Sequence, residues 1–598
     1  MISRDFRAET LYFLLVDRFC NGDPENDLGD NPACSDPTHK NWLRYFGGDL
    51  QGVLDRLDYL RAIGATTIWL SPIFDQIDAL ANDEGRLSAP YHGYWTKDFK
   101  RIDEHFLPKS EWHRPFADRG TLFDRLIAAA HAKDLRVILG VACNHTSGGG
   151  PGAPKGEIYD DGVYLTSFDD DRLGWYHRHG PIRDWNSPRE LDLGELHGLA
   201  DLNEDVWSFR HYITQTMSAW LDRGVDGFRL DAVKHMALSF WQEFTAIMRE
   251  RHPEVTLFGE WAGVSPQDVR GVHFANASGM SVLDFGFRGA AEDVLCHGHH
   301  FRRLAKVFYD DHVYDDATEL VTFLDSHDMP RLLSIGLRAE HLPLAIALLL
   351  TVRGVPCLYY GMEQGLHDDT NGGGDPHNRP LMQAWDTGTP AARALATLSA
   401  LRRRSLAVQR GFVRDVLVEQ DIYAYVRGYH HSSVLVVLNK GEAATIRLEG
   451  VLLPDGAYSD LLGLLDHPVP VQRDAISELR VPAGAALVFE SSEPLPLAKT
   501  RIVARLNGYA TQFGEHVAVV GNAPELGRFN PDHAARLYYV NQNLWMGDLL
   551  FDESAGREIL YRYVIVDSLG RVRYEDRLPR RSHVPTSGVV SWKDRWET

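Results

Sequence analysis

The sequence predicts an α/β protein whose largest part is a (β/α)8 barrel, followed by two domains built of β-strands. Short β-rich runs alternate with longer helix-compatible segments from about residue 11 to residue 364, which is the order of βα units. Most of these runs are continuously apolar, as strands covered on both faces are. The eight candidate strands are residues 11–19, 66–72, 136–145, 224–232, 255–261, 281–287, 319–328 and 355–364.

The segments between and after these strands define the domain organisation. Helix-like stretches such as 123–134 and 209–224 separate several of the strands. The stretch 146–203 is too long for a simple loop, so we interpret it as an inserted subdomain. Strand-like runs such as 421–440 and 478–490 indicate an antiparallel domain. The predicted division is a barrel over 1–145 and 204–405, the insertion at 146–203, an all-β C domain at 406–493 and a β-sandwich at 498–598.

Composition and charge exclude several classes of protein. The 598 residues are 44% hydrophobic and 24% charged, as in a soluble globular protein, and the formal net charge is −21. An acidic chain without basic runs is a poor partner for nucleic acid or an anionic membrane. The five scattered cysteines contain no CxxC pair, which argues against a disulfide scaffold or a zinc–thiolate site.

No leader with a charged and then apolar pattern precedes residue 11, so we expect a cytoplasmic protein, or a secreted one whose leader was removed. The longest strongly apolar stretch, 342–352, is too short to span a bilayer. A monomer is our expectation for the oligomeric state.

Ionisable side chains stand at the ends of several predicted strands. They are His145, Arg229, Asp231, Glu260, His327 and Asp328. The carboxyl ends of barrel strands form the active-site face. Arg229 and Asp231 are two positions apart, so both point to one side of a strand, and the arginine keeps the aspartate ionised. Any one of these residues alone would be read as a salt bridge at the rim, but three converging carboxylates predict a nucleophile, a proton donor and a positioning group.

Four sequence blocks resemble the α-amylase family, glycoside hydrolase family 13. They are GVACNH (140–145), DGFRLDAVKHM (226–236), FGEW (258–261) and FLDSHD (323–328). Further stretches are similar to cyclodextrin glucanotransferases and their close amylase relatives, namely YHGYWTKDFKRID (91–103), FANASGMSVLDF (274–285), RGVPCLYYGMEQ (353–364) and GDPHNR (374–379). The resemblance spans nearly all of residues 10–405 in order.

The resemblance implies a role for each matching residue. Asp231 would be the nucleophile, Glu260 the general acid and base, and Asp328 the stabiliser of the transition state. Tyr94 would stack under the sugar at the cleavage point. The other residues implied in substrate binding are His92, Trp95, His145, Arg229, Lys234, His235, His327, Asp375, Arg379 and, in the insertion, His197. Together they imply a retaining reaction through a covalent glucosyl–aspartate.

A second set of residues has the character of ligands for a hard cation. The segment NGDPEND (21–27) offers the side-chain oxygens of Asn21, Asp23, Asn26 and Asp27. Such a string suits Ca²⁺, although a solvated Asp/Asn turn explains it equally well. The resemblance implies a calcium ion here, shared with Gly47 and Asp49. It implies a second calcium ion at Asn144, Asp201 and the backbone of His235, with a fourth ligand near Asp192. The histidines of HGHH (297–300) are interpreted as an exposed turn rather than a metal site.

The last segment resembles a family 20 starch-binding module. The matching stretches are 517–531, 543–549 and 557–576, and the residues at the module's first sugar site are Phe529, Arg562 and Tyr574. Phe and Tyr stand where tryptophans are usual, and smaller rings weaken stacking. Two alternatives stay open, a module that binds starch weakly and a sandwich that has lost sugar binding. Trp545 is equally compatible with a core position and a contact.

The acceptor side decides between hydrolysis and transfer. Glucanotransferases carry a large aromatic residue where this chain has His197, and a phenylalanine where it has Ala262. From its length we also expect the chain to lack their extra immunoglobulin-like domain. We therefore expect an endo-acting α-1,4-glucan hydrolase that uses starch, glycogen or malto-oligosaccharides. The alternative is an α-glucanotransferase, a cyclodextrin glucanotransferase or another transglycosylase, for which cyclodextrins are further partners. A catalytically inactive glucan-binding protein is disfavoured because the three acidic residues are intact.

Overall fold

The computed structural model describes residues 5–83, 85–493 and 496–597. Eight parallel strands form one sheet in the order β12-β11-β10-β7-β2-β1-β14-β13, and a parallel bridge between Leu283 and Val321 closes it into a barrel. The strands are β1 (Leu11–Leu14), β2 (Thr67–Leu70), β7 (Arg136–Val141), β10 (Gly227–Leu230), β11 (Thr256–Gly259), β12 (Ser281–Val282), β13 (Val321–Phe323) and β14 (Val355–Tyr359). The predicted fold class is confirmed.

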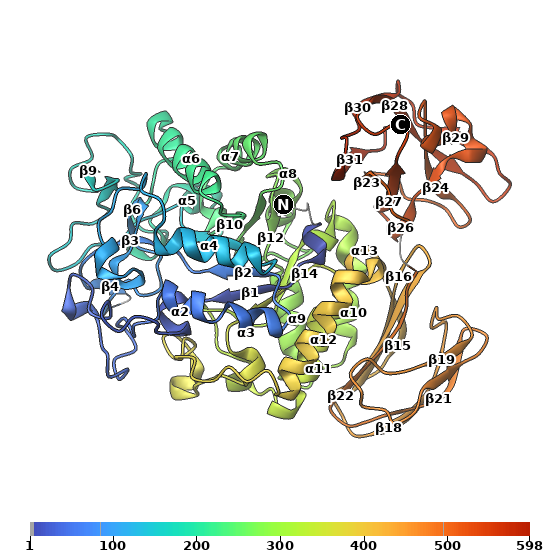
Figure 1. The fold of residues 1–598 in the computed structure, drawn as a ribbon, viewed down its shortest axis with the longest axis horizontal. Coiled ribbons are helices and arrows are strands. Elements are labelled where there is room, and N and C mark those ends of the chain that lie inside the picture. The colour runs from blue at the N-terminus through green and yellow to red at the C-terminus, as the bar shows by residue number, and fades with distance from the viewer. Residues whose placement is uncertain (1–4, 84, 494–495, 598) are drawn as a thin grey trace.

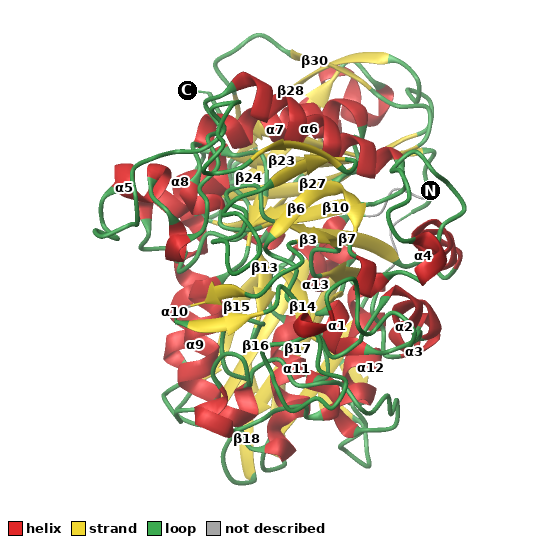
Figure 2. Cartoon of the chain, turned by 90° about the vertical axis from the view of Figure 1, so that its left-hand side faces the viewer, coloured by secondary structure: helices red, strands yellow, loops and turns green. Residues whose placement is uncertain are grey.

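Helices surround the barrel (Figures 1 and 2). Those that follow or precede barrel strands include α4 (Leu122–Ala132), α6 (Trp207–Asp222), α7 (Leu238–Arg251), α9 (Phe285–Leu295), α11 (Leu342–Thr351) and α12 (Pro390–Arg404). The start of α4 is fixed by a reciprocal capping box between Thr121 and Asp124. The apolar stretch 342–352 is α11, which is buried because it packs against both the barrel and the C domain. Within the described ranges, no helix is both long and apolar enough to cross a membrane.

The first candidate strand is shorter than predicted. Residues 11–19 contain β1 and then a helical turn, α1 (Val16–Phe19). The turn aims the Asp17 carboxylate at the backbone, where it accepts hydrogen bonds from Phe46 N at 2.9 Å and Gly47 N at 3.1 Å. Apolar composition alone does not distinguish a buried strand from a buried helical turn.

The inserted subdomain shares a sheet with the segment that follows β2. Its strands β8 (Ile158–Asp160) and β9 (Val163–Thr166) extend a sheet with β3 (Phe74–Gln76) and β6 (Thr96–Ile102), in the order β3-β6-β8-β9. The predicted sugar-binding residues His92, Tyr94 and Trp95 come directly before β6. The shared sheet therefore fixes them beside the insertion.

Two strand-rich parts follow the barrel and lie on the same side of it in Figure 1. The C domain contains the antiparallel sheet β15 (Phe412–Val418), β16 (Ile422–Tyr429), β17 (Ser432–Asn439) and β22 (Ala485–Ser491). The last part has two facing sheets, β26-β27-β23-β31 and β25-β24-β28-β29 with β30 paired to β28. Its strands are β23 (Thr500–Asn507), β24 (His516–Gly521), β25 (Ala535–Arg536), β26 (Tyr538–Asn541), β27 (Leu544–Phe551), β28 (Glu558–Val566), β29 (Val572–Tyr574), β30 (Arg580–His583) and β31 (Gly588–Arg595). The domain boundaries themselves remain predictions.

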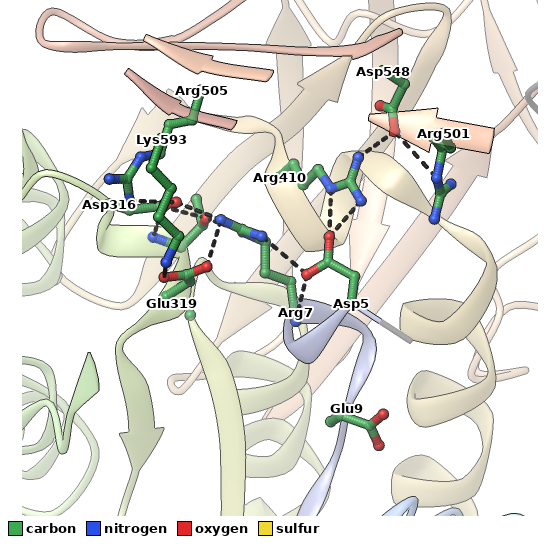
Figure 3. A network of polar contacts seen from close by, with 12 residues as sticks. Asp5, Arg7, Glu9, Asp316, Glu319, Arg410, Arg501, Arg505, Asp548 and Lys593 are labelled. Atoms are coloured by element: carbon green, nitrogen blue, oxygen red, sulfur yellow. Dashed lines mark hydrogen bonds and ion pairs between the residues drawn. The ribbon is translucent and has the colours of Figure 1, made fainter. Parts of the chain in front are cut away.

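A buried arginine joins this last part to the barrel and the C domain (Figure 3). Arg410, at the end of α13 (Leu406–Arg410), is fully buried between the carboxylates of Asp5 and Asp548. Its Nη1 lies 2.5 Å from Asp548 Oδ1, and Tyr429 Oη donates to Asp548 Oδ2 at 2.8 Å. Asp5 precedes the first barrel strand, Tyr429 belongs to β16 of the C domain and Asp548 belongs to β27 of the last part. The contacts of Arg410 and Asp548 therefore connect the barrel, the C domain and the last part of the chain.

A second set of ion pairs, centred on Arg7, lies beside the Arg410 contacts (Figure 3). We call the two sets together the docking network. Arg7 pairs with Asp316 and, at 2.9 Å, with Glu319, just ahead of β13. Arg505 of β23 lies 3.6 Å from Asp316, and Lys593 of β31 lies 3.4 Å from Glu319. These acids stand where barrel strands begin, so the last part of the chain docks at the end of the barrel opposite the carboxyl ends.

Candidate active site

The three predicted carboxylates gather at the carboxyl end of the barrel. Asp231 follows β10, Glu260 follows β11, and Asp328 lies beyond β13. Asp231 and Glu260 are largely buried, whereas Asp328 is about half exposed. The parallel strands bring them together because each strand ends at the same face of the barrel.

One arginine links the first two carboxylates. The Arg229 guanidinium is fully buried on β10 and forms an ion pair with Asp231. Its Nη2 lies 2.7 Å from Glu260 Oε2, and its Nη1 donates to Tyr94 Oη at 3.3 Å. The guanidinium therefore sets the relative positions of both carboxyl groups and of the tyrosine ring.

The same surroundings move the two pKa values apart. Burial raises the pKa of Glu260 to about 8, and the nearby charges of Asp231 and Asp328 raise it although Arg229 opposes them. Burial would also raise the pKa of Asp231, but the charge and hydrogen bond of Arg229 hold it below its ordinary value. At neutral pH the site thus holds one ionised carboxylate beside one protonated carboxylic acid, the combination that nucleophilic attack with proton donation needs.

Neutral histidines line the same site. Burial lowers the pKa values of His92 and His327 far below the ordinary range of histidine, and that of His145 in the same direction. His92 Nδ1 accepts a hydrogen bond from Tyr94 N at 3.0 Å, which leaves Nε2 as the donor. The Tyr94 ring lies parallel to the His327 ring with centroids 5.1 Å apart. Neutral imidazoles can donate to sugar hydroxyls without adding charge.

Ion pairs position Asp375 and Arg379 near Asp328. Arg379 Nη1 lies 2.9 Å from Asp375 Oδ1, and its Nη2 lies 3.8 Å from Asp328 Oδ1. Arg86 Nη2 also contacts Asp375, at 2.7 Å. The structure brings the predicted residues together and adds Arg86, which no sequence signal had marked.

An exposed tryptophan stands beside the residues predicted to face the acceptor sugar. Trp185 of the insertion is 49% exposed, and its ring centroid lies 5.7 Å from that of His197 and 6.3 Å from that of His235. Lys234, next to His235 in the sequence, donates a hydrogen bond from Nζ to the carbonyl oxygen of Ala262 at 3.5 Å. Our sequence reasoning missed Trp185. The insertion contains two tryptophans, Trp175 and Trp185, and the sequence does not specify which ring faces the site.

The segment predicted to hold the first calcium ion contains an unused buried oxygen. Asn26 Oδ1 is buried and has no hydrogen-bond partner in the described part of the chain. Asn21 Nδ2 donates to Asp27 Oδ1 at 2.7 Å, and a Cβ at Gly47 would meet both side chains within 3 Å. Asp49 instead accepts from the backbone of Gly22 and Asp23. The donor set fits a hard cation, with Asp49 supporting the loop.

The ligands predicted for the second calcium ion also converge. The Asn144 side-chain amide lies 3.0 Å from Asp201 Oδ1 and 2.9 Å from the carbonyl oxygen of His235. Burial raises the pKa of Asp201 to about 7, which a bound cation would reverse. Three oxygen-bearing groups around one point between barrel and insertion therefore fit the implied ion, while the side chain of Asp192 faces Arg270.

The residues of the predicted sugar site on the last part of the chain are only partly open. Phe529 and Tyr574 are exposed, and the Arg562 guanidinium lies over the Tyr574 ring, 5.1 Å from its centroid. Arg580 forms ion pairs with Glu575 and Asp594. Trp545 is buried in the core of the sandwich.

The turn that holds HGHH carries short contacts of its own. His297 lies 3.2 Å from Glu292, and His299 lies 3.4 Å from Asp293.

All five cysteines are free thiols.

Comparisons with known proteins show the family of the chain. The family model for the α-amylase catalytic domain matches residues 13–399, and that for a starch-binding domain matches residues 499–593. A cyclomaltodextrin glucanotransferase of Klebsiella oxytoca is 32% identical over 590 residues, covering 91% of this chain and 87% of that protein.

Solved structures give the same result. CldA, described as a cyclomaltodextrin glucanotransferase with a three-domain ABC distribution, is 39% identical with a TM-score of 0.76, covering 81% of this chain and 99% of that one. The γ-cyclodextrin glucanotransferase of alkalophilic Bacillus clarkii is 26% identical with a TM-score of 0.75, covering 99% of each chain. The chain therefore belongs to the α-amylase family, glycoside hydrolase family 13, as an enzyme that carries a starch-binding domain behind its catalytic barrel.

Proposed function

We propose that this enzyme is a retaining α-glucanotransferase, which cleaves an α-1,4-glucan and passes the glucosyl end to another sugar in preference to water. The observation that carries the proposal is the exposed Trp185 ring beside His197 and His235, since it supplies a stacking face where an acceptor sugar has to lie. Relatives whose names describe glucanotransferases support the same choice. The three-domain relative also removes the argument that a missing domain excludes transfer.

The reaction follows from the two pKa values. The ionised Asp231 attacks the anomeric carbon while Glu260 gives its proton to the departing glycosidic oxygen, which leaves a β-glucosyl ester on Asp231. Glu260, now a carboxylate, then takes the proton of an acceptor hydroxyl as that oxygen displaces Asp231. Arg229 pairs with both carboxylates and so offsets the negative charge that Glu260 gains in between. Asp328 stabilises the positive charge of the sugar in both transition states.

The pH profile of kcat/KM tests these roles. Because the pKa of Glu260 is raised to about 8, the protonated acid persists at neutral pH and is lost tenfold per pH unit above 8. Asp231 stays ionised throughout, because its pKa lies below its ordinary value of 3.8. Burial raises the pKa of Asp328 to about 6, and only its ionised form can stabilise the positive charge of the sugar, so we expect the acid limb to fall below about pH 6. We expect a plateau between these limits on a soluble malto-oligosaccharide. An alkaline limb near pH 5 would contradict the assignment of Glu260 as the acid.

Product analysis tests the choice of transfer. We expect transferred or cyclic products from soluble starch at low substrate concentration, and Trp185→Ala should lower the transfer-to-hydrolysis ratio about two- to tenfold because a stacked aromatic pair contributes ~0.5–1.5 kcal/mol. Trp185→Phe keeps an aromatic face and is the matched control. Chromatography that separates linear, cyclic and transferred products gives the ratio, and an unchanged ratio in Trp185→Ala would exclude the role of this ring.

Hydrolysis is the second candidate, because His197 and Ala262 offer little stacking surface. It predicts mainly linear products from the wild-type enzyme. Under either reaction, His197→Tyr combined with Ala262→Phe should shift products toward transfer. Wild-type digests dominated by linear hydrolysis products would make hydrolysis the main activity.

We further propose two structural calcium ions. Asn21, Asp23, Asn26, Asp27 and Gly47 would hold the first ion. Asn144, Asp201 and the His235 carbonyl would hold the second, where the ion would tie the insertion to the barrel. An ion that binds only the folded state raises stability by mass action.

Excess chelator should lower the melting temperature by several degrees and calcium, but not magnesium, should restore it. In Asn26→Ala the response to calcium should shrink. An unchanged melting temperature in chelator would refute both sites.

A further inference from the structure

A cavity of about 170 Å³ lies where the barrel, the C domain and the starch-binding domain meet. One wall is formed by the end of α10 (Arg302–Tyr309) and the turn η7 (Asp310–Val313), and another by the start of β15. The third wall is β26, whose strand packs against β15 and β16 (Figure 1). The cavity therefore exists only while the starch-binding domain is docked on the barrel.

Two exposed tyrosines from different domains line this cavity. Tyr309 of α10 is 78% exposed, and Tyr539 of β26 is 43% exposed. The Tyr539 ring is supported from behind by the buried Trp545 ring, which meets it edge-on at 5.6 Å. An aromatic ring that is held in place and left open offers an apolar face together with a polar hydroxyl tip. The two rings are suited to a flat ligand that has both apolar faces and hydroxyl groups.

The charged groups of the lining already have charged partners. Asp311 and Arg353 form a buried ion pair at 2.7 Å, and Arg353 also pairs with Asp284 behind the lining. The ring of His312 lines the cavity as well. The remaining polar groups at the mouth include the neutral amides of Asn541 and Gln542. Amide groups both donate and accept hydrogen bonds, as neighbouring sugar hydroxyls require. One ordered water needs only ~10–15 Å³ of such space, so a cavity of about 170 Å³ admits a group much larger than a water molecule.

We propose that this cleft is a second α-glucan-binding site, in which Tyr309 and Tyr539 grip a sugar unit between the barrel and the starch-binding domain. The choice of α-glucan among neutral sugars rests on the proposed function, whereas the cleft and its lining do not. The site is separate from the catalytic carboxylates, because α10, η7 and β26 lie at the end of the barrel where the strands begin. It is also distinct from the Phe529 and Tyr574 surface, since neither residue lines the cavity.

Affinity electrophoresis in gels that contain amylopectin tests the proposal. The full chain with Glu260→Gln serves as the background, so that the polymer is not consumed. Tyr309→Ala and Tyr539→Ala should each raise the apparent dissociation constant for amylopectin at least fivefold. Leu569→Ala removes an exposed apolar side chain of the starch-binding domain that is not aromatic and does not line the cavity, and it should leave retardation unchanged. Tyr574→Ala in the same background measures the domain's own surface separately.

The outcomes separate the alternatives. Loss of retardation in both tyrosine variants supports the cleft. Unchanged retardation in both overturns it, and loss in Tyr539→Ala alone overturns the two-walled site in favour of a surface on the starch-binding domain. If sedimentation shows that Tyr309→Ala abolishes self-association while retardation persists, the face binds a second copy of the chain and the proposal is wrong. Since turnover in this background is too slow to consume the polymer, none of these results depends on whether the reaction is transfer or hydrolysis.

Discussion

Glu260→Gln should lower kcat on starch by about 10³-fold or more, without unfolding the barrel. Proton donation by a positioned acid contributes ~10²–10⁴-fold, and the amide cannot donate an acidic proton to the departing oxygen. The side chain keeps its shape and can still meet Arg229, whose Nη2 lies 2.7 Å from Glu260 Oε2. Release of reducing ends from soluble starch gives the rate.

A substrate with a better leaving group sharpens this test. Fluoride departs from α-maltosyl fluoride with little help from an acid, so formation of the glucosyl ester should be largely preserved in Glu260→Gln but lost in Asp231→Asn. Glu250→Gln, on the exposed face of α7, is the matched control and should behave as wild type. Equal losses on starch and on the fluoride in Glu260→Gln would contradict its role as proton donor.

Asp548→Ala should cost about 3–5 kcal/mol of stability, because it leaves the fully buried Arg410 with one acidic partner in place of two. It also removes the acceptor of the Tyr429 hydroxyl. Calorimetry should show a lower melting temperature, and limited proteolysis should release the starch-binding domain earlier. We expect activity on short malto-oligosaccharides to be retained, since the network stands at the opposite end of the barrel from Asp231.

Asp532→Ala is the control for this change. Asp532 is an exposed carboxylate of the same domain, and the loss of an exposed charge usually changes stability by less than 0.5 kcal/mol. A melting temperature of Asp548→Ala equal to that of the control would show that the ion pair does not hold the domain in place.

The barrel could be predicted from the sequence because its strands are short apolar runs that end in polar residues. The limits of the strands could not be predicted, because they depend on packing. The run 281–287 contains only the two residues of β12 before Asp284 caps α9, and 355–364 remains extended only to Tyr359. The three predicted carboxylates could be placed together because strand ends converge in any barrel of this kind, whereas their separate roles were predicted from the resemblance.

The features that were missed depend on contacts between distant segments. The position of Trp185 follows from the fold of the insertion, where no periodic pattern indicates which ring faces the barrel. The pair between Arg410 and Asp548 joins residues that are neighbours only once the domains dock. Charges of this kind look like ordinary surface residues in a sequence, and their burial is decided by tertiary structure.

The docking network has a consequence for how the enzyme meets long substrates. A domain on a flexible tether raises the effective concentration of its ligand over all distances that the tether can reach. Here Arg410, Arg7 and their acidic partners hold the starch-binding domain at one orientation, so the gain is confined to glucans that span one fixed separation. Oligosaccharides too short to span this separation gain no affinity from the domain. The fixed position of the domain therefore favours long glucans over short ones.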